Sequence, residues 1–113
     1  MPTLFEKIIS RDIPADIVYE DEWVVAFRDI NPQAPVHVLV VPRKPLVNVA
    51  EAGPEDAELL GRVMLAAAEV ARREGVAASG YRLVLNNGEG AGQSVFHLHC
   101  HVLGGRGLRW PPG

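Results

Sequence analysis

The chain of 113 residues is long enough for one compact domain with its own core, and we expect residues 1–113 to form that single domain. Its formal charge of −3, without a basic run, argues against nucleic acid as a partner, and its single cysteine, Cys100, excludes an internal disulfide. No apolar run approaches the ~18–20 residues of a membrane span and the start of the sequence has no signal-peptide pattern, so we expect a cytoplasmic protein without a membrane partner.

The first part of the chain predicts one short helix and a β-hairpin. Thr3 and Glu6 have the spacing of a capping box, which is typical of the start of a helix, here over residues 3–9. Residues 17–20 and 23–27 are short runs of β-type residues, and only two acidic residues separate them. We therefore expect a helix followed by two antiparallel strands.

An apolar, mostly β-branched run at residues 36–41 predicts a central strand that is buried on both faces. His37 interrupts this run, and a buried imidazole needs a polar partner because leaving it unpaired costs on the order of 1–3 kcal/mol. The preceding turn-rich loop, residues 29–35, contains Asp29, which either forms a turn or accepts hydrogen bonds from ribose hydroxyls. Nearby apolar side chains form either a slot for a nucleotide base or plain core: Leu4, Phe5, Ile8, Phe27 and Ile30.

The second half of the chain predicts one long helix and two more strands. The helix begins at Pro54, which suits a first helical position, and its expected stop is Gly75. A strand is expected at 81–86, and a glycine-rich loop at 87–94 connects it to a last strand that contains three histidines. Because this connection is short, the two strands are predicted to be antiparallel. A helix that covers one face of such a sheet predicts an α+β domain.

Near the end of the chain, His97, His99 and His101 alternate with apolar residues. In a β-strand this period of two places the three imidazoles on one face and the apolar side chains on the other. Attack at phosphorus needs an aligned nucleophile, groups that neutralise the phosphoryl oxygens and a proton for the departing atom, and imidazoles are suited to this chemistry. We assign the attack to the middle residue, His99. His97 and His101 would then bind or orient phosphoryl oxygens, and His37 would join their hydrogen-bond network from a neighbouring strand.

Other readings of this region stay open on the pattern alone. One alternative is a metal site, because His-x-His on a strand is a common pair of zinc or iron ligands, although the motif has no obvious carboxylate companion. The other is that the three histidines are structural surface or core residues whose ring nitrogens are all hydrogen-bonded. The glycine-rich loop is either a plain turn or a cradle whose N–H groups bind an anion. Ser94 either donates to a leaving group or phosphoryl oxygen, or bonds its own turn. A loop suited to an anion beside the histidines favours phosphoryl chemistry over a metal.

The segment from His97 to Leu103 resembles the signature of the histidine triad (HIT) superfamily, in which three histidines alternate with apolar residues. Further segments are similar to the Hint branch, the histidine triad nucleotide-binding proteins: residues 5–9, 29–35, 92–95, 103–106 and 110–113. The resemblance covers nearly the whole chain.

This resemblance implies a HIT-like α+β fold with a five-stranded antiparallel sheet, one long and one short helix, and a homodimer in which two sheets join. It implies a purine nucleoside phosphoramidase that hydrolyses the P–N bond of adenosine 5′-phosphoramidates and aminoacyl or lysyl adenylates through a nucleotidyl-histidine intermediate, releasing AMP. No metal or other cofactor is implied. The alternatives are a dinucleoside polyphosphate hydrolase of the same superfamily and a nucleotide-responsive regulatory binding protein.

The resemblance also implies the catalytic roles. His99 attacks the α-phosphorus, His101 contacts phosphate oxygens, and His97 and His37 support the proton network. Ser94 lies near the leaving group and also binds the nucleotide.

Five further positions match nucleotide contacts of the family. Gly92 and Gln93 bind phosphate with Ser94. Asp29 matches the ribose-binding acid, Ile30 lines the base pocket, and Asn86 matches another nucleotide-contacting position.

Overall fold

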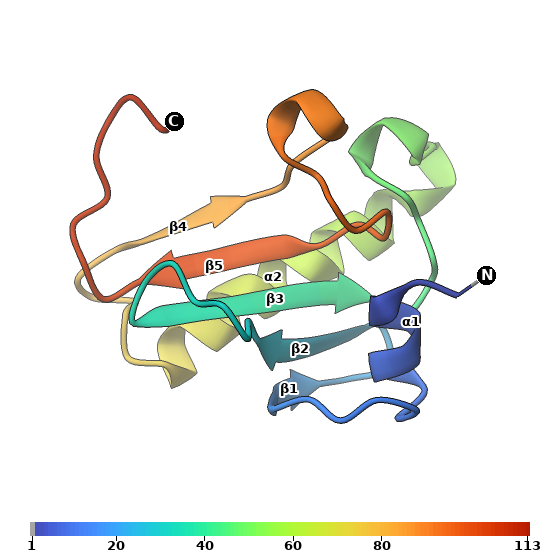
Figure 1. Ribbon diagram of the computed structural model, residues 1–113, viewed down its shortest axis with the longest axis horizontal. Coiled ribbons are helices and arrows are strands. Elements are labelled where there is room, and N and C mark those ends of the chain that lie inside the picture. Colours follow the sequence, from blue (N-terminus) through green and yellow to red (C-terminus); the bar gives the residue numbers. More distant parts are fainter. Residues whose placement is uncertain (1) are drawn as a thin grey trace.

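A five-stranded antiparallel sheet lies at the centre of the computed structural model, which describes residues 2–113 (Figure 1). The strands lie in the order β1-β2-β3-β5-β4. Their bounds are β1 Ile17–Glu20, β2 Val24–Arg28, β3 Val36–Pro42, β4 Tyr81–Val84 and β5 Cys100–Gly104. The short helix α1, Leu4–Ile9, and the long helix α2, Ala57–Arg73, complete the α+β fold. The predicted fold class, strand number and helix pair are therefore confirmed.

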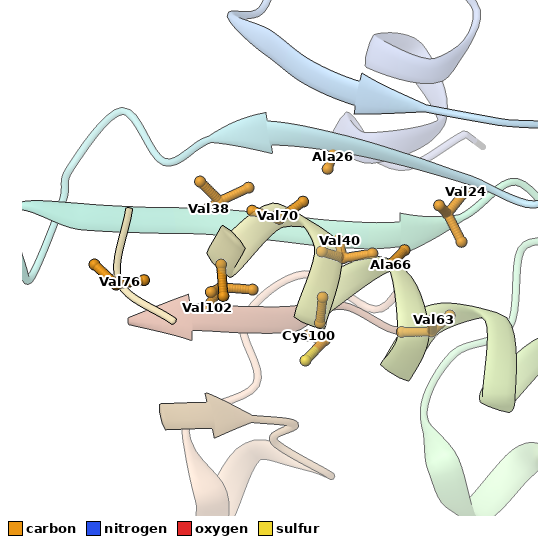
Figure 2. Close-up of a cluster of buried hydrophobic side chains, with 12 residues drawn as sticks. Val24, Ala26, Val38, Val40, Val63, Ala66, Val70, Val76, Cys100 and Val102 are labelled. Carbon is orange, nitrogen blue, oxygen red and sulfur yellow. The ribbon is translucent and has the colours of Figure 1, made fainter. Parts of the chain in front are cut away.

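The central strand β3 is buried on both faces, as its apolar run predicts. Val38 and Val40 belong to the larger core cluster, in which they pack with α2 (Figure 2). Leu39 and Val41 alternate with them and pack on the other face with residues of α1 and β2. The two faces of the sheet are therefore covered by different elements, α2 on one face and α1 on the other.

Helix α2 forms one layer against the sheet, and its apolar residues at helical spacing are buried. Its start differs from the prediction, because Pro54–Asp56 form a turn of 3-10 helix and the α-helix begins at Ala57. Its end agrees with the prediction: Gly75 has φ 77°, and the amide of Val76 donates to the carbonyl of Ala71.

The strand with the histidines is shorter than predicted, because β5 begins only at Cys100 and the two preceding histidines lie before it. A physical reason lies in β3, where Pro42 has no N–H to continue the ladder. The amide of Leu98 instead donates to the carbonyl of Leu46, at 2.6 Å. The alternation nevertheless persists, because Leu98 and Cys100 are both buried in the core.

The connection between β4 and β5 is longer than the predicted short loop, since it runs over residues 85–99. The two strands are still antiparallel, with Val84 opposite His101. Strand β4 is at the edge of the sheet and pairs only with β5. None of the helices within residues 2–113 is long and apolar enough to cross a membrane.

Candidate active site

A pocket of about 320 Å³ lies on the α1 face of the sheet. Its polar lining comes from the end of β2 and the loop after it, and from β5 and the segment that enters it. Most of the apolar lining comes from α1, the loop after α1, β2 and β3. This combination of an apolar interior and a few convergent polar groups is typical of a small-molecule site. The lining residues are Leu4, Phe5, Ile8, Ile13, Pro14, Ala15, Phe27, Arg28, Asp29, Ile30, Leu39, Ser94, Val95, His99 and His101.

His99 has one ring nitrogen fixed by the backbone. Its Nδ1 lies 2.7 Å from the carbonyl oxygen of His97, and a carbonyl only accepts, so Nδ1 carries the proton. In the neutral ring, Nε2 then keeps its lone pair. The edge contact with Phe5, whose ring centroid is 4.9 Å away, holds the plane of the imidazole. The side chain lines the pocket although the residue is only 8% exposed, so the geometry presents a neutral nucleophile.

A second chain of hydrogen bonds sets the tautomer of His101. The backbone N–H of Gln33 donates to Nδ1 of His37 at 3.0 Å, which places the proton of His37 on Nε2. That Nε2 lies 2.9 Å from Nδ1 of His101 and donates to it. Nδ1 of His101 is therefore the acceptor, and its proton is on Nε2. His101, which lines the pocket beside His99, is a hydrogen-bond donor next to the nucleophile.

His97 is fully buried and does not line the pocket. Its Nε2 lies 2.8 Å from the carbonyl oxygen of Pro42, so Nε2 carries the proton. Among residues 2–113, its Nδ1 is a buried side-chain atom without a hydrogen-bond partner. The His97 ring therefore fixes the backbone whose carbonyl accepts from His99. Because the ring does not line the pocket, it does not reach phosphoryl oxygens there as predicted.

Burial keeps the four imidazoles neutral. It is the largest cause that lowers the pKa of His37, His97 and His99 below 6.5, although the charge of Asp29 opposes it at His37. For His101, burial followed by the charges of His99 and His37 lowers the pKa to about 4. At neutral pH the site therefore holds uncharged rings whose tautomers are fixed by hydrogen bonds.

We expect the acid limb of a plot of kcat/KM against pH to lie below pH 6.5. Since the neutral form of His99 is the nucleophile and burial lowers its pKa from 6.5, protonation begins only at lower pH. The rate should therefore hold as the pH falls through 6.5 and decline further down, in an assay run from about pH 4 to 8. A limb centred above pH 6.5 would contradict this assignment.

Three predicted nucleotide contacts lie at the pocket. The carboxylate of Asp29 accepts from the amide of Asn31 at 2.8 Å, and its other oxygen is 3.4 Å from Nε2 of His37. The turn-forming role of this aspartate is therefore confirmed, and its contact with ribose hydroxyls stays a prediction for a residue that lines the pocket. Ser94 is exposed in the pocket lining, and Ile30 is 98% exposed there.

Three others do not line the pocket: Asn86, Gly92 and Gln93. The amides of Gly92 and Gln93 donate to carbonyls of their own loop, so neither points freely at an anion. The buried side chain of Gln93 donates to the carbonyl of Val47 at 2.7 Å and braces the loop. Their nucleotide contacts stay predictions, and Ser94 is the residue of this loop that reaches the pocket with a hydroxyl.

The structure also adds features that the sequence reasoning missed. One is the backbone N–H of Gln33, which donates to His37. Every residue except proline has such a group, so the residue type gives no signal for this role. Ile13 and Ala15 complete the apolar lining from the segment between α1 and β1, for which the sequence predicts no role. The available signal is that two apolar residues flank Pro14. Phe5, Ile8 and Phe27 are core residues, and they also line the pocket. That they form a slot for a nucleotide base stays a prediction.

Three side chains at the site have the spacing of ligands for a divalent cation. Asp29, His37 and His101 each offer one ligand atom, and these atoms lie within 4.8 Å of one another. A carboxylate does therefore lie beside the histidines, contrary to the argument from the motif alone. A metal bound there would displace the proton of His37 Nε2 and so break the hydrogen bond to His101.

Comparison with known proteins identifies the family of this chain. The model of the HIT domain matches residues 10–108. An uncharacterized HIT-like protein of Synechocystis sp. is 59% identical over 111 residues, which cover 98% of this chain and 96% of that protein. The purine nucleoside phosphoramidase of Escherichia coli K12 is 50% identical over 106 residues, which cover 94% of this chain and 89% of that protein. A HIT family hydrolase from Legionella pneumophila is 46% identical and has a TM-score of 0.96, covering 99% of this chain and 100% of that structure. The chain therefore belongs to the HIT domain family.

Proposed function

We propose that this protein is a hydrolase that acts as a purine nucleoside phosphoramidase and releases AMP from adenosine 5′-phosphoramidates and aminoacyl or lysyl adenylates. The observation that carries the proposal is the fixed pair of tautomers, with the lone pair of His99 Nε2 beside the N–H donor of His101 in one pocket. The name and 50% identity of the Escherichia coli relative support the reaction class.

The proposed reaction has two displacements at the α-phosphorus. For a phosphoramidate, Nε2 of His99 first forms a bond to phosphorus as the P–N bond breaks, and the leaving nitrogen takes a proton from solvent through the Ser94 hydroxyl and departs as an amine. In the second displacement, water attacks phosphorus and releases a proton to solvent, the bond to Nε2 breaks, and AMP leaves with the neutral imidazole restored. His101 donates to a phosphoryl oxygen whose charge grows during both steps, and the Ser94 hydroxyl donates to the leaving nitrogen.

The nucleoside would occupy the apolar half of the pocket. Phe5, Ile8 and Phe27 are buried there and offer a surface for a purine base, and Ile30 at 98% exposure is free to cover it. The carboxylate of Asp29 accepts from the ribose hydroxyls. Removing this apolar surface from water on binding favours a nucleoside over a simple phosphoramidate by about 25 cal/mol per Å² buried.

A rate assay with adenosine 5′-phosphoramidate, with and without a chelator, tests the function. We expect kcat/KM of about 10⁴ M⁻¹s⁻¹ or more, unchanged by the chelator. A value far lower would favour a nucleotide-responsive binding protein, faster cleavage of a dinucleoside polyphosphate would favour the alternative hydrolase, and loss of activity with the chelator would assign the Asp29–His37–His101 group to a metal.

We also propose that two copies associate through β4, one of the two edge strands of the sheet, so that their sheets continue into one another. A strand at an open edge offers a row of backbone donors and acceptors for a second copy. Light scattering at micromolar concentration should give twice the mass of the chain. A monomer at that concentration would contradict the assembly.

A further inference from the structure

We propose that Arg106 is a positioning residue that holds Gln33 in place and thereby sets the tautomers of His37 and His101. This inference rests on the proposed function, because it explains how a group outside the pocket controls the donor that faces the phosphoryl oxygens. Arg106 lies just after β5 and does not line the pocket.

The first step is the contact between two loops. Nε of Arg106 donates to the carbonyl of Gln33 at 3.0 Å, and its Nη1 donates to the carbonyl of Gly107 at 3.0 Å. Beside it, Gly105 has φ 88°, and a Cβ there would lie 2.9 Å from Cβ of Pro35. The turn after β5 therefore packs closely on the loop that contains Gln33, and the arginine clamps the two together.

The second step is the effect of Gln33 on the rings. Its N–H donates to Nδ1 of His37, so the proton of that ring is on Nε2 and faces His101. If Gln33 moves away, His37 is free to carry its proton on Nδ1 and to turn an acceptor toward His101. His101 would then hold its own proton on Nδ1 and present a lone pair, instead of a donor, to the phosphoryl oxygens.

One other group bears on the same ring. The carboxylate of Asp29, 3.4 Å from Nε2 of His37, also favours a proton on that nitrogen. Gln33 and Asp29 therefore both favour the tautomer of His37 with its proton on Nε2, and Arg106 controls only the contribution of Gln33.

The test combines histidine ¹⁵N NMR, which distinguishes protonated from unprotonated ring nitrogens without substrate, with steady-state kinetics. In Arg106→Ala we expect His37 to show a mixture of tautomers and kcat to fall about tenfold, with KM within about twofold, as when partners that orient site histidines are removed. Arg106→Lys, which keeps a donor, should recover most of the rate. Arg72→Ala removes an exposed arginine that pairs with Glu69 on α2 and should change neither quantity.

A second pair of variants isolates the backbone donor. Gln33→Pro removes the N–H, and Gln33→Ala keeps it while removing the side chain. We expect a loss of about 10–100-fold in kcat for the proline variant. The alanine variant keeps the N–H and loses only the bond from the Gln33 side chain to the carbonyl of Asn31, so its loss should be clearly smaller.

Unchanged tautomers in Arg106→Ala would overturn the inference, even if the enzyme hydrolyses phosphoramidates. If instead the wild type has no such activity, the NMR result still tests whether Arg106 sets the tautomers, so the two failures remain distinct. Should Gln33→Pro not fold, the comparison of Arg106→Ala with Arg106→Lys decides the matter.

Discussion

His99→Ala is expected to lower kcat on adenosine 5′-phosphoramidate by on the order of 10⁴-fold or more, because the variant has no nucleophile for the phosphorus. The ring lines the pocket and touches the core only through its edge contact with Phe5, so the fold should survive. Single-turnover kinetics at saturating substrate measure the change directly.

His99→Asn serves as the matched control, since its amide keeps polarity and partial volume but cannot attack phosphorus. Both variants should bind AMP and give the dispersed NMR spectrum of the wild type. A rate within tenfold of wild type in either folded variant would show that another group attacks.

His101→Leu is the change with the second largest expected effect, a loss of about 10²–10³-fold in kcat. It removes the donor beside the nucleophile, and removal of one such donor at a developing charge typically costs this much. It also leaves the Nε2–H of His37 without its acceptor at 2.9 Å. The comparison is made at saturating substrate, so that a change in binding does not enter.

His101→Gln keeps a side-chain N–H and should lose less than the leucine variant. Because His37 acts through His101, adding His37→Asn to His101→Leu should cost little further rate, although His37→Asn alone is harmful. Additive losses in the double variant would mean that the two rings act independently and that the proposed chain of donors is wrong.

Most of the fold can be predicted from the spacing of apolar residues along the sequence. The run at residues 36–41 has no polar face, and β3 does lie at the centre of the sheet, packed on both sides. The apolar spacing after Pro54 places α2 on one face, and only its first turn differs. The alternation places Leu98 and Cys100 in the core and His99 and His101 at the pocket, whereas His97, which lies before β5, is fully buried and does not line the pocket.

The remainder depends on backbone groups and on contacts distant in sequence. Pro42 limits the ladder of β3 and offers its carbonyl to His97, which turns a predicted phosphate ligand into a buried anchor. Gln33 acts through an amide that every residue but proline has, so its side chain carries no signal. Gln93 was read from family resemblance as a phosphate ligand, yet its amide group is occupied in bracing the loop.

The polar residues of the pocket also divide into features that the sequence predicts and features that need the folded chain. His99, Ser94 and Asp29 lie together as the sequence predicts, because each is carried by a segment next to the central strands. Which nitrogen of each ring has the proton depends on partners as far apart as residues 33 and 101. That assignment, from which the proposed chemistry follows, needs the folded chain.

The covalent intermediate gives the most direct test of the central claim that His99 Nε2 attacks phosphorus. Wild-type protein mixed with an adenosine phosphoramidate is quenched within a single turnover, digested and examined by mass spectrometry. The account predicts one nucleotidyl group on the peptide that contains His99, with the adduct on that residue, formed and lost at rates that match turnover and absent in His99→Ala. Release of the amine at the full rate with no adduct, or an adduct on a different residue, would contradict it.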